Sequence, residues 1–366
     1  MLPFVDAKRR FDAEGPQSLF RDPDGNRFLK LRSLGRKQYL DTLAANAGIT
    51  LTGPARRALQ ELYEADIEDA IIEQTIGEIY RAERADRRAQ EAPLLAELYK
   101  VQALDWGGLY QNSLEKTIVD RYVKQLRDYD RLCDAIDNEL QNSLRSYVVS
   151  SWYNHWTSIL IEDVFRDHPS VLPAVGLTKQ IDFFWRGVPF DLKVTFLPEG
   201  FIKDGRRAGE LRPELTELKA CARSLGLHWD NDLPDSRLVQ DLWTMLSDHP
   251  DAEASNLIER LRRYRLDLLD TARADPTGLM TWFYENQGVR RFDASNRLFL
   301  VLVDTDDFFG SWRLKRAQPL ISKMVQKELG GLGSPGKRIP FDYEGNSYEA
   351  LAQCIFVVTG TDGEDS

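Results

Sequence analysis

The chain of 366 residues has only three cysteines, Cys133, Cys221 and Cys354, and they lie far apart. An odd number at wide spacing gives no disulfide framework. None is needed, because a chain of this length buries roughly three-quarters of its unfolded surface. The four histidines show no HExxH spacing, so a zinc site is not expected. We expect a reducing compartment, the cytoplasm.

Long apolar stretches are missing as well. The longest clear one, Leu298–Val303, has six residues, whereas a helix that crosses a bilayer needs about 20. The first residues, MLPFVDAKRRFDAEG, carry charges where a secretory signal has its apolar segment. We expect no membrane partner. At about 150 residues per domain, the length predicts one large or two medium domains.

Basic charge is in the minority. The chain has 58 acidic and 48 basic residues, a net charge of −10. Proteins that coat nucleic acid without specificity are usually basic, so that role is not expected. A local basic groove is still compatible with this total.

Helical periodicity dominates residues 1–136, which we predict to be a mainly helical N-terminal region. Apolar residues recur at helical spacing over 54–92, where Pro93 is expected to end the helix, and again over 113–133. The first 50 residues are expected to form loops and, after the turn residues Asp22–Gly25, a short strand.

Residues 137–366 are predicted to form an α/β domain (α+β by content) in which helices flank a small mixed sheet. A long helix is expected over 137–166. The segments KQIDFFW (179–185) and FDLKVTFL (190–197) are rich in β-formers and joined by a tight turn, which predicts a hairpin. The later elements are a helical insertion at about 200–296, a strand at 298–303, a helix at 312–329, a strand at 354–359 and a frayed tail from 361.

Three acids and one lysine stand out around this hairpin. Asp191 and Lys193 are two residues apart on the second strand, so their side chains share one face. Asp182 lies on the first strand among isoleucine and phenylalanine, where an acid needs a partner or a metal. Glu162 interrupts the apolar end of the long helix, and packing that helix on the sheet would bring Glu162 beside Asp182.

This donor set suits phosphodiester hydrolysis. Mg²⁺ binds through one or two carboxylates and keeps several waters. We expect Asp182, Asp191 and the backbone carbonyl of Leu192 to hold Mg²⁺, with Mn²⁺ able to replace it. A bound cation lowers the pKa of its water and offsets negative charge. Lys193 would orient or help deprotonate that water, and Glu162 would hold a second metal or a metal-bound water.

The pattern Glu–x19–Asp–x8–Asp–x–Lys, formed by Glu162, Asp182, Asp191 and Lys193, resembles the PD-(D/E)xK nuclease superfamily with its restriction-endonuclease-like fold. The resemblance covers roughly 138–197 and the later predicted strands and helix, in an order close to the superfamily's αβββαβ core. It implies an Mg²⁺-dependent endodeoxyribonuclease acting on double-stranded DNA, in a restriction or phage-defence system. Ile181 stands where the motif name has proline, and the insertion interrupts the core.

An acid two residues before a lysine says little alone. With 58 acids and 14 lysines, chance gives about two such pairs, and the chain has three: Asp6–Lys8, Glu217–Lys219 and Asp191–Lys193. Only the last lies in a predicted hairpin with an acid on the opposite strand. The alternative for it is a surface ion pair, which contributes little stability.

Two further motifs suggest other chemistries. Asp304 and Asp306 follow an apolar strand, as the nucleophile and acid of aspartate-nucleophile phosphatases do; the alternative is an acidic loop. Gly331–Lys337 superficially resembles a phosphate-binding loop, but Arg338 stands where Ser or Thr should bind Mg²⁺. We interpret that segment as a helix stop and a loop.

Five arginines, Arg260, Arg262, Arg263, Arg290 and Arg291, form two basic runs. A solvated face is the default interpretation, and in a nuclease such a run would contact the phosphate backbone.

The sequence leaves two alternatives to a DNA endonuclease. One is an RNA-directed or structure-directed nuclease of the same fold, and the other is a non-catalytic helical interaction protein. Cutting both strands with one site per chain would imply a symmetric homodimer.

Overall fold

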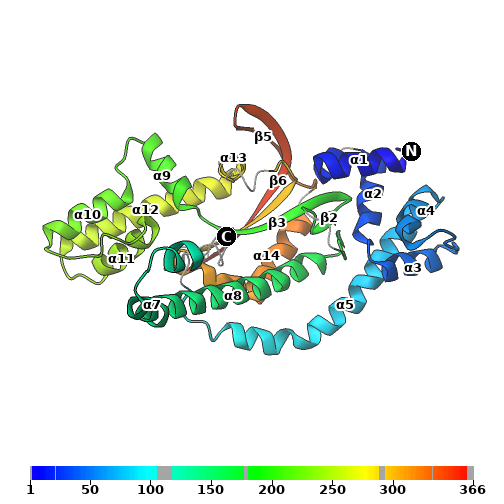
Figure 1. The fold of residues 1–366 in the computed structure, drawn as a ribbon. Helices are drawn as coiled ribbons and strands as arrows, with labels where there is room; N and C mark the ends of the chain where they lie inside the picture. The colour runs from blue at the N-terminus through cyan, green and yellow to red at the C-terminus, as the bar shows by residue number, and fades with distance from the viewer. Residues whose placement is uncertain are drawn as a thin grey trace.

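The computed structural model describes residues 2–20, 22–104, 118–176, 180–287, 293–331 and 333–360. Its centre is one six-stranded mixed sheet of order β1-β2-β3-β4-β6-β5 with helices around it (Figure 1). The predicted small mixed sheet flanked by helices is therefore confirmed. In the described part of the chain, no helix combines the length and apolarity needed to cross a membrane.

The sheet has an antiparallel part and a parallel part. Its strands are β1 (Val171–Pro173), β2 (Phe183–Trp185), β3 (Val188–Phe196), β4 (Arg297–Asp304), β5 (Lys337–Tyr343) and β6 (Asn346–Thr359). The first three form an antiparallel meander, β4 runs parallel to both β3 and β6, and β5 is antiparallel to β6. The predicted hairpin is confirmed. Arg186 and Gly187 form its turn with φ angles of 50° and 81°, as a type I′ turn requires.

One face of the sheet packs on α8 (Gln141–Arg166) and α14 (Gln318–Gly331). On β3, Phe190 and Leu192 belong to this core, together with the even-numbered leucines of β4. Because side chains alternate along a strand, Asp191 and Lys193 face the other side.

Helices are inserted between β3 and β4, and part of this insertion covers the opposite face of the sheet. They are α9 (Glu199–Ala208), α10 (Glu214–Ser224), α11 (Asp235–Ser247), α12 (Ala252–Ala274) and α13 (Thr277–Glu285). Residues of α9, α12 and α13 pack on Phe299, Val301 and Val303 of β4. Helices α10, α11 and the first part of α12 share a separate apolar core and extend away from the sheet (Figure 1).

The N-terminal helices lie at the other end of the molecule (Figure 1). They are α1 (Phe4–Glu14), η1 (Pro16–Leu19), α2 (Pro23–Ser33), α3 (Lys37–Asn46), η2 (Ala55–Arg57), α4 (Ala58–Glu64) and α5 (Asp69–Leu98). Their core includes Ile181 and Phe184 from the hairpin. The helical region and the sheet are thus joined by shared apolar packing.

Several sequence predictions about these elements are wrong. The loops expected over the first 50 residues are largely replaced by α1, α2 and α3. The strand expected after Asp22–Gly25 is helix α2, because Asp22 caps its first N–H groups and proline suits the first helical turn. Pro93 does not end α5; it lies near the C-terminal end, where a lost hydrogen bond disrupts few turns. The helix expected from residue 312 starts at Gln318, after the 3₁₀ segment η6 (Phe308–Arg316).

One of the two remaining helix predictions is confirmed and the other is not. The helix predicted over 137–166 is confirmed as α8, entered through the π-helical segment η4 (Ile136–Leu140). The helix predicted over 113–133 is instead split into η3 (Val119–Val123) and α7 (Tyr129–Ala135). Three predicted parts lie outside the described residues. They are the first residues of the helix predicted over 113–133, Lys179 of the predicted strand, and the tail from residue 361.

Candidate active site

The candidate site lies where β2 and β3 diverge. The last paired residues are Phe183 and Phe190, and the N–H of Asp182 still donates to the carbonyl of Phe190 at 2.9 Å. Asp182 itself precedes β2 by one residue rather than lying within the strand. Beyond this point, β3 keeps β4 as its neighbour on one side only.

The side chain of Asp182 pairs with the edge of β3 where β2 no longer does. The N–H of Asp191 points to β4, where the carbonyl of Asn296 accepts it at 2.9 Å. The next N–H along a strand points to the opposite edge, and the N–H of Leu192 donates to Asp182 Oδ2 at 2.7 Å. The carbonyl of Leu192 points to the same edge as its N–H, so it lies on the Asp182 side of β3, as the sequence prediction needs.

Asp191 and Lys193 meet on one face of β3. Lys193 Nζ lies 2.6 Å from Asp191 Oδ2 and donates to Oδ1 at 2.8 Å. Asp191 is only 6% exposed, whereas the Lys193 side chain is 46% exposed. The carboxylate is therefore fixed inside the fold while the ammonium group reaches solvent.

Arg297 is a site residue that the sequence interpretation missed. It is the register partner of Asp191 on β4, it is buried, and its Nε lies 3.7 Å from Asp191 Oδ2. Asp293 and Gln287 hold its other end at 3.0 Å and 2.7 Å. The sequence shows a basic residue directly before the apolar run Leu298–Val303, but this position alone does not indicate that Arg297 lies beside Asp191.

Glu162 approaches the site from α8. Its carboxylate pairs with Arg166 one turn later at 2.9 Å, and Arg166 Nε donates to the backbone carbonyl of Asp182 at 3.2 Å. Arg166 thus connects the end of α8 to the backbone of the divergence point. The predicted packing of α8 on the sheet brings Glu162 to this neighbourhood.

The three carboxyl groups disfavour each other's ionisation. Burial raises the pKa of Asp191 to about 6, and the charge of Asp182 adds to the increase. Burial and the charge of Glu162 raise the pKa of Asp182. Burial also raises the pKa of Glu162, while Arg166 opposes the increase. Because ionisation of these carboxyl groups is unfavourable without a compensating positive charge, the site favours the binding of a cation.

The residues present fit a divalent cation. Asp191 Oδ2 is buried and accepts no hydrogen bond. Lys193 Nζ lies at ion-pair distance from this oxygen, but the angle between them does not suit a hydrogen bond. Within the described ranges, no group of three or more His, Cys, Asp or Glu side chains is arranged as a metal site. Mg²⁺ needs only one or two carboxylates, and Asp182, Asp191 and the Leu192 carbonyl can supply that smaller set.

The predicted DNA-contacting arginines of α12 are all engaged in ion pairs. Arg260, Arg262 and Arg263 pair with Glu217, Asp306 and Glu259, respectively. Arg260 and Arg263 remain 64% and 70% exposed, so phosphate could compete for them. Arg290 and Arg291 lie outside the described residues.

The two competing motifs form loops. Asp304 Oδ1 accepts the N–H groups of Asp306 and Asp307 at 3.1 Å and 3.2 Å, so this carboxylate caps the turn after β4. The phosphate-loop-like segment follows helix α14 and leads into β5, which is the helix stop and loop that we expected.

No known protein family, no curated protein and no solved structure matches this chain.

Proposed function

We propose that the protein is a divalent-metal-dependent endonuclease that hydrolyses DNA phosphodiester bonds, with double-stranded DNA as its substrate and a restriction or phage-defence role. The single observation that carries this proposal is the hydrogen bond from Leu192 N–H to Asp182 Oδ2. It holds one carboxylate against the strand that presents Asp191 and Lys193.

Each residue of the site has a defined task in this proposal. Asp182, Asp191 and the Leu192 carbonyl would hold Mg²⁺, or Mn²⁺ in its place. The ion would supply an activated water and offset the developing charge on the phosphate. Lys193 is exposed enough to touch that phosphate and to orient the attacking water. Glu162, held by Arg166, would accept a proton or bind a further water.

The order of the elements supports a restriction-endonuclease-like core. A helix, α8, precedes the meander β1-β2-β3, and β4, α14, β5 and β6 follow the insertion, so that β1 and β5 are additions to the αβββαβ order. The site lies where β2 and β3 diverge within this sheet, and the helices of the insertion and the N-terminal helices lie on opposite sides of the sheet (Figure 1). These helical parts would contact the duplex, while a homodimer would supply the second cut.

The test is incubation of the purified chain with plasmid DNA, single-stranded DNA and RNA, in Mg²⁺ and in EDTA. The proposal expects nicked or linear plasmid in Mg²⁺ only, and no product from Asp191→Ala. Cleavage confined to RNA or to single-stranded substrates would establish the related alternative on the same fold. Equal cleavage by Asp191→Ala would refute the site assignment.

A non-catalytic interaction protein is the second candidate. One observation favours it: α8 exposes Leu144, Val148 and Trp152 at four-residue spacing, with 39%, 54% and 36% of each residue exposed. Such a stripe is the usual feature of a helix that docks another protein. Absence of cleavage on every substrate and with every divalent ion would favour this candidate.

A further inference from the structure

A pocket of about 400 Å³ opens at the carboxyl end of β3, beyond the candidate active site. It lies between the end of that strand, the 3₁₀ segment η6 and the first turns of α11 in the insertion. The volume is at the low end for small-ligand pockets. It suits one planar group and is far too small for a duplex.

The pocket is in line with the site. Thr195 lines it and follows Asp191 by four residues on the same strand, and both side chains face the same side of the sheet. At about 3.3 Å per residue the two are about 13 Å apart. That span corresponds to at most about four stacked nucleotides at 3.4 Å each.

Aromatic rings form one wall, and they are held in place. Phe308 and Phe309 line the pocket, and the guanidinium of Arg265 lies 5.4 Å and 5.0 Å from their ring centres. Arg265 is 2% exposed and pairs with Glu199 and Glu214 at 3.0 Å and 2.6 Å. The rings are therefore prepared before any ligand arrives, which lowers the entropic cost of stacking.

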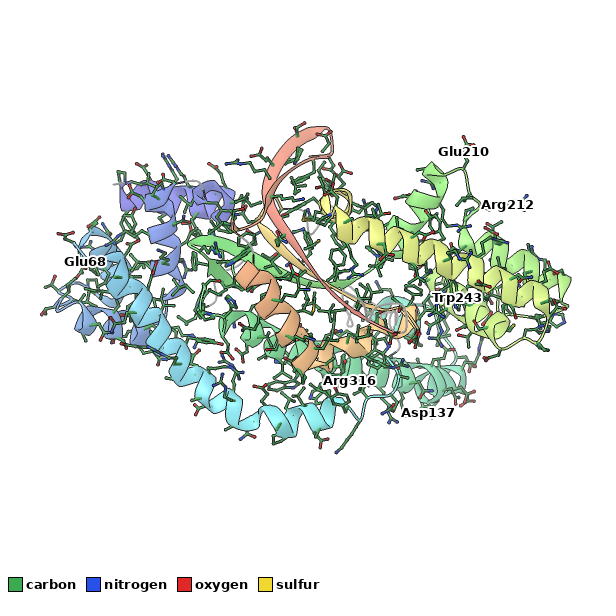
Figure 2. All side chains as sticks on the ribbon, turned by 180° about the vertical axis from the view of Figure 1, so that it is seen from behind. Glu68, Asp137, Glu210, Arg212, Trp243 and Arg316 are labelled. Atoms are coloured by element: carbon green, nitrogen blue, oxygen red, sulfur yellow. The ribbon has the colours of Figure 1, made fainter. Side chains whose placement is uncertain are left out.

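The neighbouring aromatic contacts make this wall rigid. Trp243 of α11 meets Phe309 edge-on at 5.8 Å, and Figure 2 labels Trp243 where the insertion meets the middle of the molecule. Trp312 forms another part of the pocket, and its backbone carbonyl accepts the hydroxyl of buried Tyr153 at 3.1 Å.

Polar side chains also line the pocket. Gln240 of α11 lines the pocket and is half-buried, and its side chain makes no hydrogen bond to another described residue. An amide offers a donor and an acceptor together, which is the pattern that matches a base edge. Ser236 and Arg237 lie one turn earlier on the same helix.

From this arrangement we propose that the pocket binds one unpaired nucleobase of the substrate strand, stacked on Phe308 and Phe309 and hydrogen-bonded by Gln240. The inference rests on the proposed function, because it assumes that the strand passes over Asp191 and Lys193. It adds a requirement to that function: the enzyme engages a base that has left the duplex stack.

The test measures binding in EDTA, so that no cleavage is needed. Two fluorescent deoxyribose strands of equal length are compared, one entirely abasic and one with a single central base. Stacking of one base is worth about a tenfold gain in affinity, and we expect the parent to show that gain. Gln240→Ala and Phe309→Ala should lose it, while Gln38→Ala, an exposed glutamine on α3, should keep it.

Equal affinity of the parent for the two strands would overturn the proposal, and so would a gain that persists in both pocket variants. If Phe309→Ala fails to fold, as circular dichroism would reveal, Gln240→Ala alone decides. The result is separable from catalysis. A gain without plasmid cleavage refutes the proposed nuclease but keeps the pocket, and cleavage without a gain refutes only the pocket.

Discussion

The carboxylate of Asp182 accepts a hydrogen bond from the backbone N–H of Leu192 at 2.7 Å, and this bond couples sheet pairing to the candidate chemistry. The bond gives a partner to a backbone N–H of β3 that β2 no longer reaches. It also places the Asp182 carboxylate against the residue that follows Asp191. Substitutions of Asp182 can therefore separate its structural role, which is to accept this hydrogen bond, from the role of its negative charge.

Asp182→Asn should keep the structural part and lose the charged part. The asparagine oxygen can still accept the Leu192 N–H, and burial raises the pKa of Asp182, so loss of the charge should leave stability equal or higher. Mn²⁺ binding should disappear in a calorimetric titration. Asp182→Ala, which leaves that N–H without a partner, should cost about 1–3 kcal/mol in urea unfolding. Full Mn²⁺ binding by Asp182→Asn would contradict the assignment.

Asp191→Asn should stabilise the metal-free protein above pH 7. The pKa of Asp191 is raised to about 6 in the folded state, while the unfolded carboxyl titrates near about 3.9. Between these values the native state binds more protons, so the free energy of unfolding falls as the pH rises. Asparagine does not ionise and so avoids this loss of stability. We therefore expect a gain of about 3 kcal/mol at pH 8, measured by urea unfolding in EDTA.

Adding Mg²⁺ is the control for that experiment. The parent should gain stability as the ion binds the folded state, and Asp191→Asn should not. A variant that is less stable than the parent in EDTA would show that the ion pair with Lys193 outweighs the cost of burial.

Metal affinity should depend on pH with a known sign. Asp191 must lose its proton to bind a cation. Below about pH 6, the affinity for Mn²⁺ should therefore fall by about tenfold per pH unit, and above about pH 7 it should level off. Calorimetry or paramagnetic relaxation between pH 5 and pH 8 would check this. A flat profile would mean that the ion binds elsewhere.

Lys193→Ala should reduce cleavage by about a hundredfold or more, because in the proposed reaction Lys193 would contact the phosphate and orient the attacking water. Metal binding should persist near neutral pH with a midpoint moved upwards, since Lys193 lowers the pKa of Asp191. The matched control is Lys8→Ala, from the chance pair Asp6–Lys8 on α1. If both variants cut equally well, Lys193 has no part in the reaction.

Arg263→Ala tests whether α12 follows the phosphate backbone. Loss of one phosphate contact should reduce the slope of log affinity against log salt by about 1. Arg9→Ala on α1 is a suitable comparison, because Arg9 is 73% exposed and locally paired, much as Arg263 is 70% exposed and paired with Glu259. Equal slopes for both variants would place α12 away from the nucleic acid.

The sequence predicted the central hairpin because its signals are local. Arg186–Gly187 marks a tight turn, and Asp191 and Lys193 alternate with apolar residues that must face a core. The approach of Glu162 followed from the apolar end of α8 in the same way. Neither the divergence of β2 and β3 nor the capping of Leu192 by Asp182 could be derived, because both depend on where the strand pairing stops.

The missed elements depend on tertiary contacts. β1 has three residues and ends in Pro173, too few for a periodic signal. β5 is half exposed and contains Pro340, which suits an edge strand but reads as a loop. Arg297 could not be assigned from sequence, because only the parallel register of β3 and β4 sets it beside Asp191.

The most direct measurement is the anomalous density of a crystal soaked in Mn²⁺. Our account predicts one strong peak about 2.1 Å from oxygens of Asp182 and Asp191 and from the Leu192 carbonyl, typical of octahedral oxygen ligands, and no such peak in Asp191→Asn. Anomalous signal only at other positions, with the Lys193–Asp191 pair intact, would contradict it.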